Sequence, residues 1–275
     1  MKKLIALILV ACALFYYYLE HDRPENVRIF RVGVECNFVP HNWEENRSTD
    51  ANVPIMNHPG YYADGYDVQI AKLVAEALKA QLIVIKYDWE ELLDALEHKQ
   101  IDAVFSGMAD TEERKQRAAF TDTYEIAKAE YAVMVRKNGP YVSAKSLLDL
   151  SGASILGQKG TNFDTVIDQI PNVNHLEPAD TVADMIARLM NNKTDGIVVN
   201  LDTGQSYERL YSTNLTLIRF PEGAGFNLGF NGVCAGVRKE DTKLLNDINN
   251  AINSIPTRQR QRIMDQTISR VWENL

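Results

Sequence analysis

The sequence lacks the features that mark several large classes of protein. Its formal net charge is −8, and no stretch is rich in lysine and arginine, which argues against nucleic acid as a partner. The five histidines are scattered, with no pair at the spacing of zinc ligands, so we expect no metal site. A phosphate-binding P-loop is missing, and the glycine-rich stretch at 223–232 lacks the spacing of a dinucleotide-binding loop. We therefore expect no cofactor.

Residues 1–26 have the features of an export signal followed by a tether. Two lysines precede the apolar run at 4–11, and the stretch Leu-Val-Ala-Cys matches a bacterial lipobox in which Cys12 would be lipidated. Apolar residues continue to Leu19, so an uncleaved signal anchor is the alternative, although the run is slightly short for a spanning helix of about 20 residues. Either interpretation predicts an extracytoplasmic, membrane-anchored protein.

Cysteine is scarce, since only Cys36 and Cys234 remain after Cys12. An even number of cysteines in an oxidising compartment is compatible with a disulfide. Two isolated buried thiols are equally compatible, because the sequence alone does not bring the two residues together.

What the sequence does contain is a repeated alternation of strands and helices, which predicts an α/β fold. Strands are expected at 28–35, 82–86 and 101–106, helices at 67–80 and 89–98, and a polar loop at 44–65. The pattern recurs with strands at 154–157 and 196–199 and helices at 163–170 and 181–190. The segment LLDALEHKQIDAVFS aligns without gaps with MIARLMNNKTDGIVV, pairing Leu96 with Leu189 and Asp102 with Asp195. We expect two similar lobes with a ligand cleft between them.

Two breaks in the pattern predict where the chain crosses between the lobes. The Gly-Pro break that follows the strand expected at 131–137 indicates one boundary, and the glycine-rich stretch indicates the other. Residues 27–135 would form the first part of lobe 1, residues 136–231 lobe 2, and residues 232–275 the return to lobe 1. Two crossings make a two-strand hinge, which permits closure on a ligand.

Several motifs in this order resemble the bacterial extracellular solute-binding proteins, family 3, from about Arg31 to the C-terminus. They are VGVECNFVPHNW, GYDVQIAKLVAEAL, SGMADTEERK, the GQKGT loop and GVRKED. The resemblance implies a type II periplasmic-binding-protein fold. It also implies the substrate-binding component of an ABC importer for polar amino acids, with membrane permease subunits as partners. We expect a monomer without enzymatic activity.

Arg114 is the principal candidate for ligand binding. It lies in the first turn of a helix that we expect to be capped by Asp110 or Thr111, where the helix dipole disfavours a cation. A guanidinium pairs bidentately with a carboxylate. From the residues alone, a surface arginine paired with Glu113 or Asp110 is equally compatible. In the resembling family the corresponding arginine grips the ligand's α-carboxylate, so the resemblance assigns that role to Arg114.

The resemblance assigns further ligand contacts in both lobes. Glu35, Phe38 and Trp89 would form the side-chain pocket, although core packing is the commoner fate of an aromatic residue. An acid beside two aromatics favours a polar or basic amino acid such as arginine, lysine, histidine or glutamine. The remaining contacts lie where strands meet helices, as is usual in open α/β sheets. These residues are Ser106, Gly107, Met108, Gln158, Thr161 and Asn162.

Asn200 departs from the family pattern. Relatives commonly carry an acid at this position, which pairs with the ligand's α-ammonium, whereas an amide brings no charge. Asp202 could substitute through a local shift, or the ligand is not a standard α-amino acid.

Other functions remain as alternatives. The triplet Asp202-Thr203-Gly204 matches that of aspartic proteases, but that chemistry needs two carboxylates and the chain has one such triplet. The same fold hosts a periplasmic cyclohexadienyl dehydratase, in which a carboxylate such as Glu35 would act as a general acid, but no second catalytic group is evident. A ligand sensor for a separate kinase is the third alternative.

Overall fold

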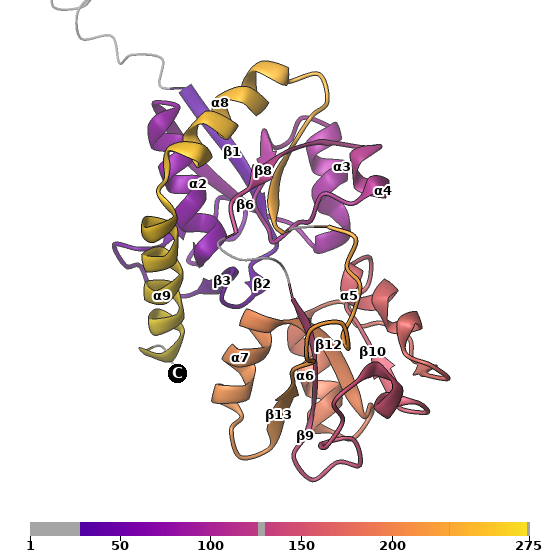
Figure 1. Cartoon of the computed structure of the whole chain (residues 1–275). Coiled ribbons are helices and arrows are strands. Elements are labelled where there is room, and N and C mark those ends of the chain that lie inside the picture. The colour runs from indigo at the N-terminus through magenta and orange to yellow at the C-terminus, as the bar shows by residue number, and fades with distance from the viewer. Residues whose placement is uncertain (1–27, 126–129, 231, 274–275) are drawn as a thin grey trace, which may run out of the picture.

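The computed structural model describes residues 28–125, 130–230 and 232–273. It shows two lobes stacked one above the other, with the C-terminal helices on the first (Figure 1). Residues 28–125 and 232–273 are called lobe 1 below, and residues 130–230 lobe 2. The predicted signal peptide, Cys12 and the tether lie outside the described residues. No helix within the described ranges has the length and apolarity needed to cross a membrane.

Lobe 1 is built on a five-stranded sheet of order β6-β1-β7-β14-β8. Its strands are Arg28–Val34 (β1), Ala80–Lys86 (β6), Ala103–Val104 (β7), Ala119–Thr123 (β8) and Cys234–Val237 (β14). Strand β1 runs parallel to β6 and β7, and β14 runs antiparallel to both of its neighbours. From Phe30 onward, alternate residues of β1, namely Phe30, Val32 and Val34, pack into one core cluster. This period of two is the alternation that predicted the strand.

Helices cover both faces of this sheet (Figure 1). Residues of α2 (Tyr66–Ala77), α8 (Thr242–Ser254) and α9 (Thr257–Glu273) join the core cluster that contains β1. On the other face, a 3₁₀ turn at Trp89–Glu91 continues into α3 (Leu92–Glu97), which packs on β6 and β7. The predicted helix at 89–98 is therefore present, although its first turn is not α-helical.

Lobe 2 repeats the arrangement with a five-stranded sheet of order β11-β10-β12-β9-β13. Its strands are Tyr131–Arg136 (β9), Ser154–Leu156 (β10), Asn174–His175 (β11), Gly196–Asn200 (β12) and Leu215–Ile218 (β13). Its helices are α5 (Asn162–Thr165), α6 (Val182–Met190) and α7 (Leu201–Leu210), with 3₁₀ turns at Leu147–Leu150 and Val166–Gln169. In each lobe three parallel strands are followed by an antiparallel fourth strand. The prediction of two similar α/β lobes is confirmed.

One predicted boundary differs from the structure. Strand β9 pairs with β12 and β13 in the sheet of lobe 2, so the boundary predicted between residues 135 and 136 comes too late in the chain. The Gly-Pro break at 139–140 follows β9 inside lobe 2. The return to lobe 1 precedes β14, where it was expected.

The internal sequence repeat corresponds to a repeated contact. Asp102 Oδ2 accepts a hydrogen bond of 2.9 Å from the backbone N–H of Arg31 at the first strand of lobe 1. Asp195 Oδ2 accepts one of 3.0 Å from the N–H of Ser154 at the start of β10, the corresponding strand of lobe 2. The paired aspartates therefore fix the same strand edge in each lobe.

An arginine completes each of these contacts. Arg238 Nη1 donates to the Leu96 carbonyl at 3.3 Å, and Arg136 Nη1 donates to the Leu189 carbonyl at 2.9 Å. Each arginine also reaches the aspartate of its own lobe, with N–O distances of 3.5 and 3.6 Å. The predicted pairing of Leu96 with Leu189 is thus a structural equivalence.

A small sheet joins the first strand to α2. It contains Asn37–Phe38 (β2), Asn42–Glu45 (β3), Val53–Pro54 (β4) and Tyr62–Asp64 (β5) in the order β2-β3-β5-β4. The segment predicted as a polar loop at 44–65 therefore includes strands.

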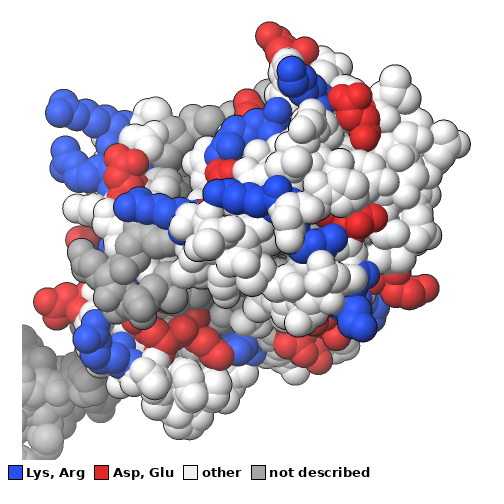
Figure 2. Space-filling view, turned by 90° about the horizontal axis from the view of Figure 1, so that it is seen from below, with Lys and Arg blue, Asp and Glu red and all other residues white. Residues whose placement is uncertain are grey.

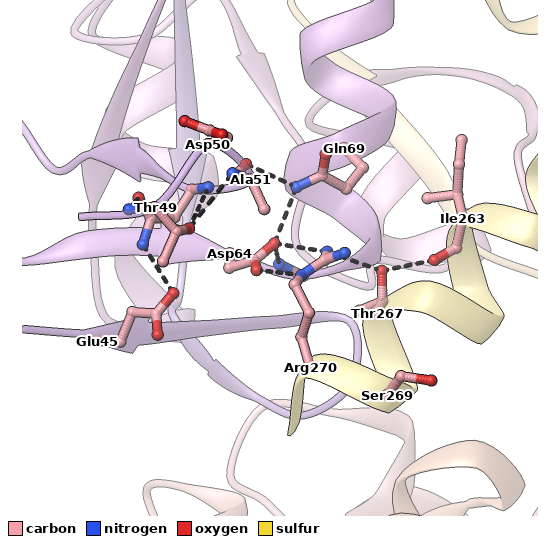
Figure 3. Close-up of polar contacts among 12 residues, drawn as sticks. Glu45, Thr49, Asp50, Ala51, Asp64, Gln69, Ile263, Thr267, Ser269 and Arg270 are labelled. Carbon is pink, nitrogen blue, oxygen red and sulfur yellow. Dashed lines mark hydrogen bonds and ion pairs between the residues drawn. The ribbon is translucent and has the colours of Figure 1, made fainter. Parts of the chain in front are cut away.

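The C-terminal helix is fastened to lobe 1 by a buried ion pair. Arg270 of α9 donates to both oxygens of Asp64, from Nε at 2.6 Å and from Nη2 at 2.9 Å. Gln69 Nε2 also donates to Asp64, and Thr267 Oγ1 accepts from the Arg270 guanidinium (Figure 3). These contacts hold α9 against the hairpin that precedes α2, as the predicted return to lobe 1 requires.

Cys36 and Cys234 are both free and buried. Of the two alternatives for these residues, the structure has the isolated thiols. Burial raises the pKa of the Cys234 thiol to about 12, so it stays protonated at neutral pH.

Charges of both signs are interspersed on the molecular surface shown in Figure 2. Basic and acidic side chains neighbour each other over that face, so it does not present a field of one sign.

Candidate ligand-binding site

A cavity between the lobes brings together most of the predicted site. Its lining from lobe 1 comprises Glu35, Phe38, Trp89, Gly107, Ala109 and Arg114, and from lobe 2 Tyr131, Gln158, Thr161, Asn162 and Phe163. Three predicted residues, Ser106, Met108 and Asn200, do not line it. The cavity measures about 30 Å³, which is the space of about one water molecule. An amino acid can therefore enter only when the lobes move apart.

Arg114 is buried at this cavity and makes no ion pair with any described carboxylate. It belongs to a short helix, α4 (Glu112–Lys115). The N-cap of this helix is Thr111, whose Oγ1 accepts a hydrogen bond of 3.3 Å from the backbone N–H of Arg114. The residue is 9% exposed. Asp110, one of the partners considered for a surface arginine, pairs with Lys115 instead at 3.0 Å. The surface alternative does not hold.

The contacts of the Arg114 guanidinium are with neutral groups. Nη1 donates to the Ala109 carbonyl at 3.1 Å and Nη2 to the Gly160 carbonyl at 3.3 Å. Its Cζ lies 5.0 Å from the centroid of the Trp89 ring. Burial lowers the pKa of Arg114, but a guanidinium remains charged in proteins. Because two carbonyls do not neutralise a buried cation, the arrangement favours an anionic ligand.

Glu35 is the acid of the cavity. It directly follows β1, is 3% exposed, and its backbone N–H donates to Ser106 Oγ at 2.9 Å. Gln158 Nε2 of lobe 2 donates to its Oε1 at 2.6 Å. Burial raises the pKa of Glu35 to about 7, although the bond from Gln158 opposes the shift. Near neutral pH this carboxyl can therefore ionise to hold a cation.

The loop at 106–108 shapes the cavity from behind. Gly107 has φ +66°, and a Cβ added there would lie 2.6 Å from Phe38 Cε1, so only glycine fits. The fully buried carboxyl of Asp67 accepts hydrogen bonds from Tyr124 and Asn42; burial raises its pKa, and these bonds and the backbone of Gly107 oppose the rise. Ser106 and Met108 are buried and position this loop.

Aromatic side chains from both lobes enclose the cavity. Phe38 is 5% exposed and stacks on His41 with centroids 4.7 Å apart. On the other side, the centroid of the Phe163 ring lies 5.9 Å from that of Phe38 and 4.9 Å from that of Tyr131. Sequence reasoning did not select Tyr131 and Phe163. The available signals were their positions in the sequence, because Tyr131 is close to the predicted hinge and Phe163 directly follows the predicted cap at Thr161 and Asn162.

Three consecutive residues of lobe 2 reach across to lobe 1. Besides Gln158, Lys159 Nζ lies 2.8 Å from Glu90 Oε2. The Gly160 carbonyl accepts from Trp89 Nε1 at 2.9 Å as well as from Arg114. The predicted GQKGT loop is therefore the part of lobe 2 that covers Arg114.

The next two residues, Thr161 and Asn162, differ in whether their side chains already make hydrogen bonds. Thr161 Oγ1 donates to the Gln158 carbonyl at 2.7 Å and accepts from Phe163 N at 3.1 Å, so its hydroxyl caps α5. Asn162 Nδ2 is buried near the Tyr131 hydroxyl but makes no hydrogen bond of good geometry within the described residues. Asn162 is thus a second donor facing the cavity beside Arg114.

Asn200 lies outside the cavity lining and its amide is already bonded. Oδ1 accepts from Thr203 N at 3.0 Å and caps α7, while Nδ2 lies 2.9 Å from Nε2 of His41 in lobe 1. Asp202 lies in the first turn of α7 and also does not line the cavity.

Two larger hollows lie nearby. One of about 270 Å³ adjoins the outer side of Arg114 and is also lined by Glu90 and Glu113. The other, of about 380 Å³, lies between the β2–β3 hairpin and helices α6 and α7, and is lined largely by apolar residues such as Val39, Trp43 and Tyr207. None of the predicted site residues lines the second hollow. In the described parts of the chain, no cluster of His, Cys, Asp and Glu could hold a metal ion.

Comparison with known proteins identifies the family. The model for bacterial extracellular solute-binding proteins, family 3, matches residues 30–269. The chain belongs to this family. A relative from Campylobacter jejuni described as "Probable histidine-binding protein" is 26% identical over 243 residues, which cover 84% of this chain and 86% of the relative. The "ABC transporter arginine-binding protein 1" of Escherichia coli K12 is 30% identical over 210 residues, which cover 74% of this chain and 80% of that protein.

Solved structures agree with this assignment. The arginine-bound form of a truncated ArgBP from T. maritima is 26% identical, has a TM-score of 0.67, and covers 83% of this chain and 96% of that chain. The prediction of a type II periplasmic-binding-protein fold is confirmed, and so is the prediction of an amino-acid-binding protein of the ABC transporter class.

Proposed function

We propose that the ligand of this solute-binding protein is an amino acid with a positively charged side chain, held between Arg114 and Glu35. The observation that carries the proposal is the burial of Arg114 in the interlobe cavity without an acidic partner among the described residues. A buried guanidinium is stabilised by a carboxylate, which can accept two parallel hydrogen bonds from it. Asn162 Nδ2 supplies a further donor beside it.

The carboxyl of Glu35, opposite in charge to Arg114, selects the ligand's side chain. Glu35 presents a buried carboxyl between aromatic walls, and such an environment favours a guanidinium, an ammonium or an imidazolium. The names of the relatives, which describe histidine-binding and arginine-binding proteins, support a basic ligand.

Binding would proceed by parting and closure of the lobes. The ligand's carboxylate replaces the Gly160 carbonyl at Arg114, so a neutral acceptor is exchanged for a charged one. The loop at 158–160 then returns over the ligand. Closure creates the surface that a membrane permease would recognise, and a single copy of the chain suffices for both lobes and both charges, so we propose a monomer.

A thermal-shift panel of the twenty standard amino acids against the purified protein tests this function. We expect stabilisation by arginine, lysine or histidine, since a ligand at 100 times its Kd adds about 2.7 kcal/mol to the free energy of unfolding. Stabilisation by acidic or aliphatic amino acids alone would contradict the proposal.

We also propose that the chain is held at the membrane by a lipid on Cys12. The lipobox-like residues 9–12 support this attachment. Mass spectrometry of the mature protein should find an N-terminus at Cys12 carrying acyl chains, and Cys12→Ser should release the protein from the membrane. An intact N-terminus at Met1 would support the uncleaved anchor instead.

A further inference from the structure

We propose that Asn200 joins the two lobes through His41 instead of holding the ligand's α-ammonium, so that the site selects a carboxylate and a distant cation with little discrimination at the α-amino group. The inference deepens the proposed function and rests on it.

The contacts of Asn200 leave it poorly suited to an ammonium. An ammonium only donates hydrogen bonds and needs acceptors. The acceptor of the Asn200 side chain, Oδ1, already accepts from Thr203 N at 3.0 Å, and Nδ2 is a donor. Nδ2 lies 2.9 Å from His41 Nε2 in the opposite lobe. The residue is 9% exposed and does not line the cavity.

His41 is suited to accept this hydrogen bond. The ring is fully buried and packs face to face on Phe38, with centroids 4.7 Å apart. Burial lowers the pKa of His41 to about 4, so the ring is neutral at physiological pH. When Asn200 donates to Nε2, the ring proton lies on Nδ1, which has no hydrogen-bond partner among the described residues. The pair therefore links the wall of the cavity, Phe38, to the N-terminus of α7.

The described residues that line the cavity contain one acid, Glu35. Glu35 and Arg114 are not paired with each other, since Glu35 Oε1 accepts from Gln158 and the Arg114 guanidinium donates to the carbonyls of Ala109 and Gly160. An α-ammonium is attached to the carbon next to the carboxylate, so it stays at the Arg114 end of the cavity. The acids in the adjoining hollow are Glu90, which pairs with Lys159, and Glu113, which is exposed, so solvent screens both.

The charges of the cavity consequently match a ligand with one negative and one positive end. An ω-guanidino or ω-amino carboxylate satisfies both, whereas a basic α-amino acid brings a second cation that meets no buried acid. A site with a buried partner for the ammonium rejects the analogue that lacks it by on the order of 10⁴-fold. We expect the difference here to be about tenfold or less.

Isothermal titration calorimetry of the full-length protein with matched ligand pairs tests this inference. The pairs are L-arginine with 5-guanidinopentanoate, L-lysine with 6-aminohexanoate, and L-histidine with imidazolepropionate, each differing only in the α-amino group. For the amino acid that binds, we expect its partner to bind within about tenfold. Binding of the amino acid with loss of more than about 100-fold for its partner overturns this inference and leaves the proposed function standing. Failure of all six compounds overturns both.

A variant distinguishes the lobe contact from a ligand contact. Asn200→Ser retains a residue that caps α7 but cannot reach His41. We expect both members of the binding pair to weaken by the same factor, so that their affinity ratio is unchanged. A selective loss of the α-amino acid would show that Asn200 holds the ammonium and would overturn the inference. The ratio in the unmodified protein decides the matter even if this variant is unstable.

Discussion

Arg114 lies over the indole of Trp89, and both side chains donate to one carbonyl, that of Gly160 in the opposite lobe. The guanidinium is thus oriented by an aromatic face and by neutral acceptors. A carboxylate that enters the cleft can replace the carbonyl without reorienting the arginine, which reduces the ordering that binding requires. This arrangement is the basis of the predictions below.

Affinity for a cationic ligand should depend on the ionisation of Glu35. Burial raises the pKa of this carboxyl to about 7, and a bound cation favours the ionised form. Because the protonated acid must lose its proton to pair with the cation, affinity should rise about tenfold per pH unit up to about pH 7 and level off above it. Titration calorimetry from pH 5.5 to 8.5 measures this profile. Glu35→Gln should bind more weakly and with a flat profile, and an unaltered slope in this variant would contradict the assignment.

The Gly107 position should not tolerate a side chain. Gly107→Ala forces a positive φ on a residue with a Cβ and places that atom 2.6 Å from Phe38 Cε1. We expect a loss of about 2–4 kcal/mol in the free energy of unfolding, measured by urea denaturation. Gly223→Ala is the control, since Gly223 has φ +78° but no atom within 4 Å of the added Cβ. Equal losses in the two variants would mean that the contact with Phe38 is unimportant.

Asp102 should contribute to stability through the contacts that the repeat predicts. Removal of its carboxylate in Asp102→Ala leaves the backbone N–H and the guanidinium of Arg31 without the carboxylate that binds both, at a cost of about 2–3 kcal/mol in unfolding free energy. The exposed pair of Asp247 with Lys243 provides a control, because Asp247→Ala should cost less than about 1 kcal/mol.

The Asp102 contribution should also disappear in acid. Burial alone would raise the pKa of Asp102, but the hydrogen bonds from Arg31 outweigh it and the net shift is downward. A carboxyl with a lowered folded pKa stabilises the protein above its unfolded pKa of about 3.9 and ceases to do so as the pH falls through the folded value. The difference between the unmodified protein and Asp102→Ala should therefore shrink below about pH 4. A difference that stays constant down to pH 2.5 would contradict this account.

The sequence predicted those parts of the molecule that repeat or follow a local rule. The alignment that paired Asp102 with Asp195 corresponds to real equivalence because each residue performs the same local task at its strand edge. The alternation in β1 and the cap at Thr111 are likewise local. The lobe boundary was placed too late because Gly139 and Pro140 mark a turn within lobe 2, while residues 126–129, which separate the described parts of the two lobes in the sequence, contain neither glycine nor proline.

The contacts that depend on distant residues were not predictable in this way. His41 and Asn200 are 159 positions apart, and no periodicity relates them. The burial of Arg114 likewise arises from Gly160 and Trp89, which belong to different lobes. Tyr131 was missed because it begins the strand that was assigned to the wrong lobe. Tertiary packing, not local pattern, decides these positions.

The affinity of Arg114 variants for L-arginine, measured by titration calorimetry at pH 8, tests the central claim most directly. We expect Arg114→Ala to weaken binding at least about 100-fold. The affinity of Arg114→Lys should lie between those of Arg114→Ala and the unmodified protein, because an ammonium lacks the planar pair of donors. Arg117→Ala is the matched control, since Arg117 pairs with Asp94 and Glu97 outside the cavity, and it should bind like the unmodified protein. Retention of affinity within a few-fold in Arg114→Ala would contradict the account.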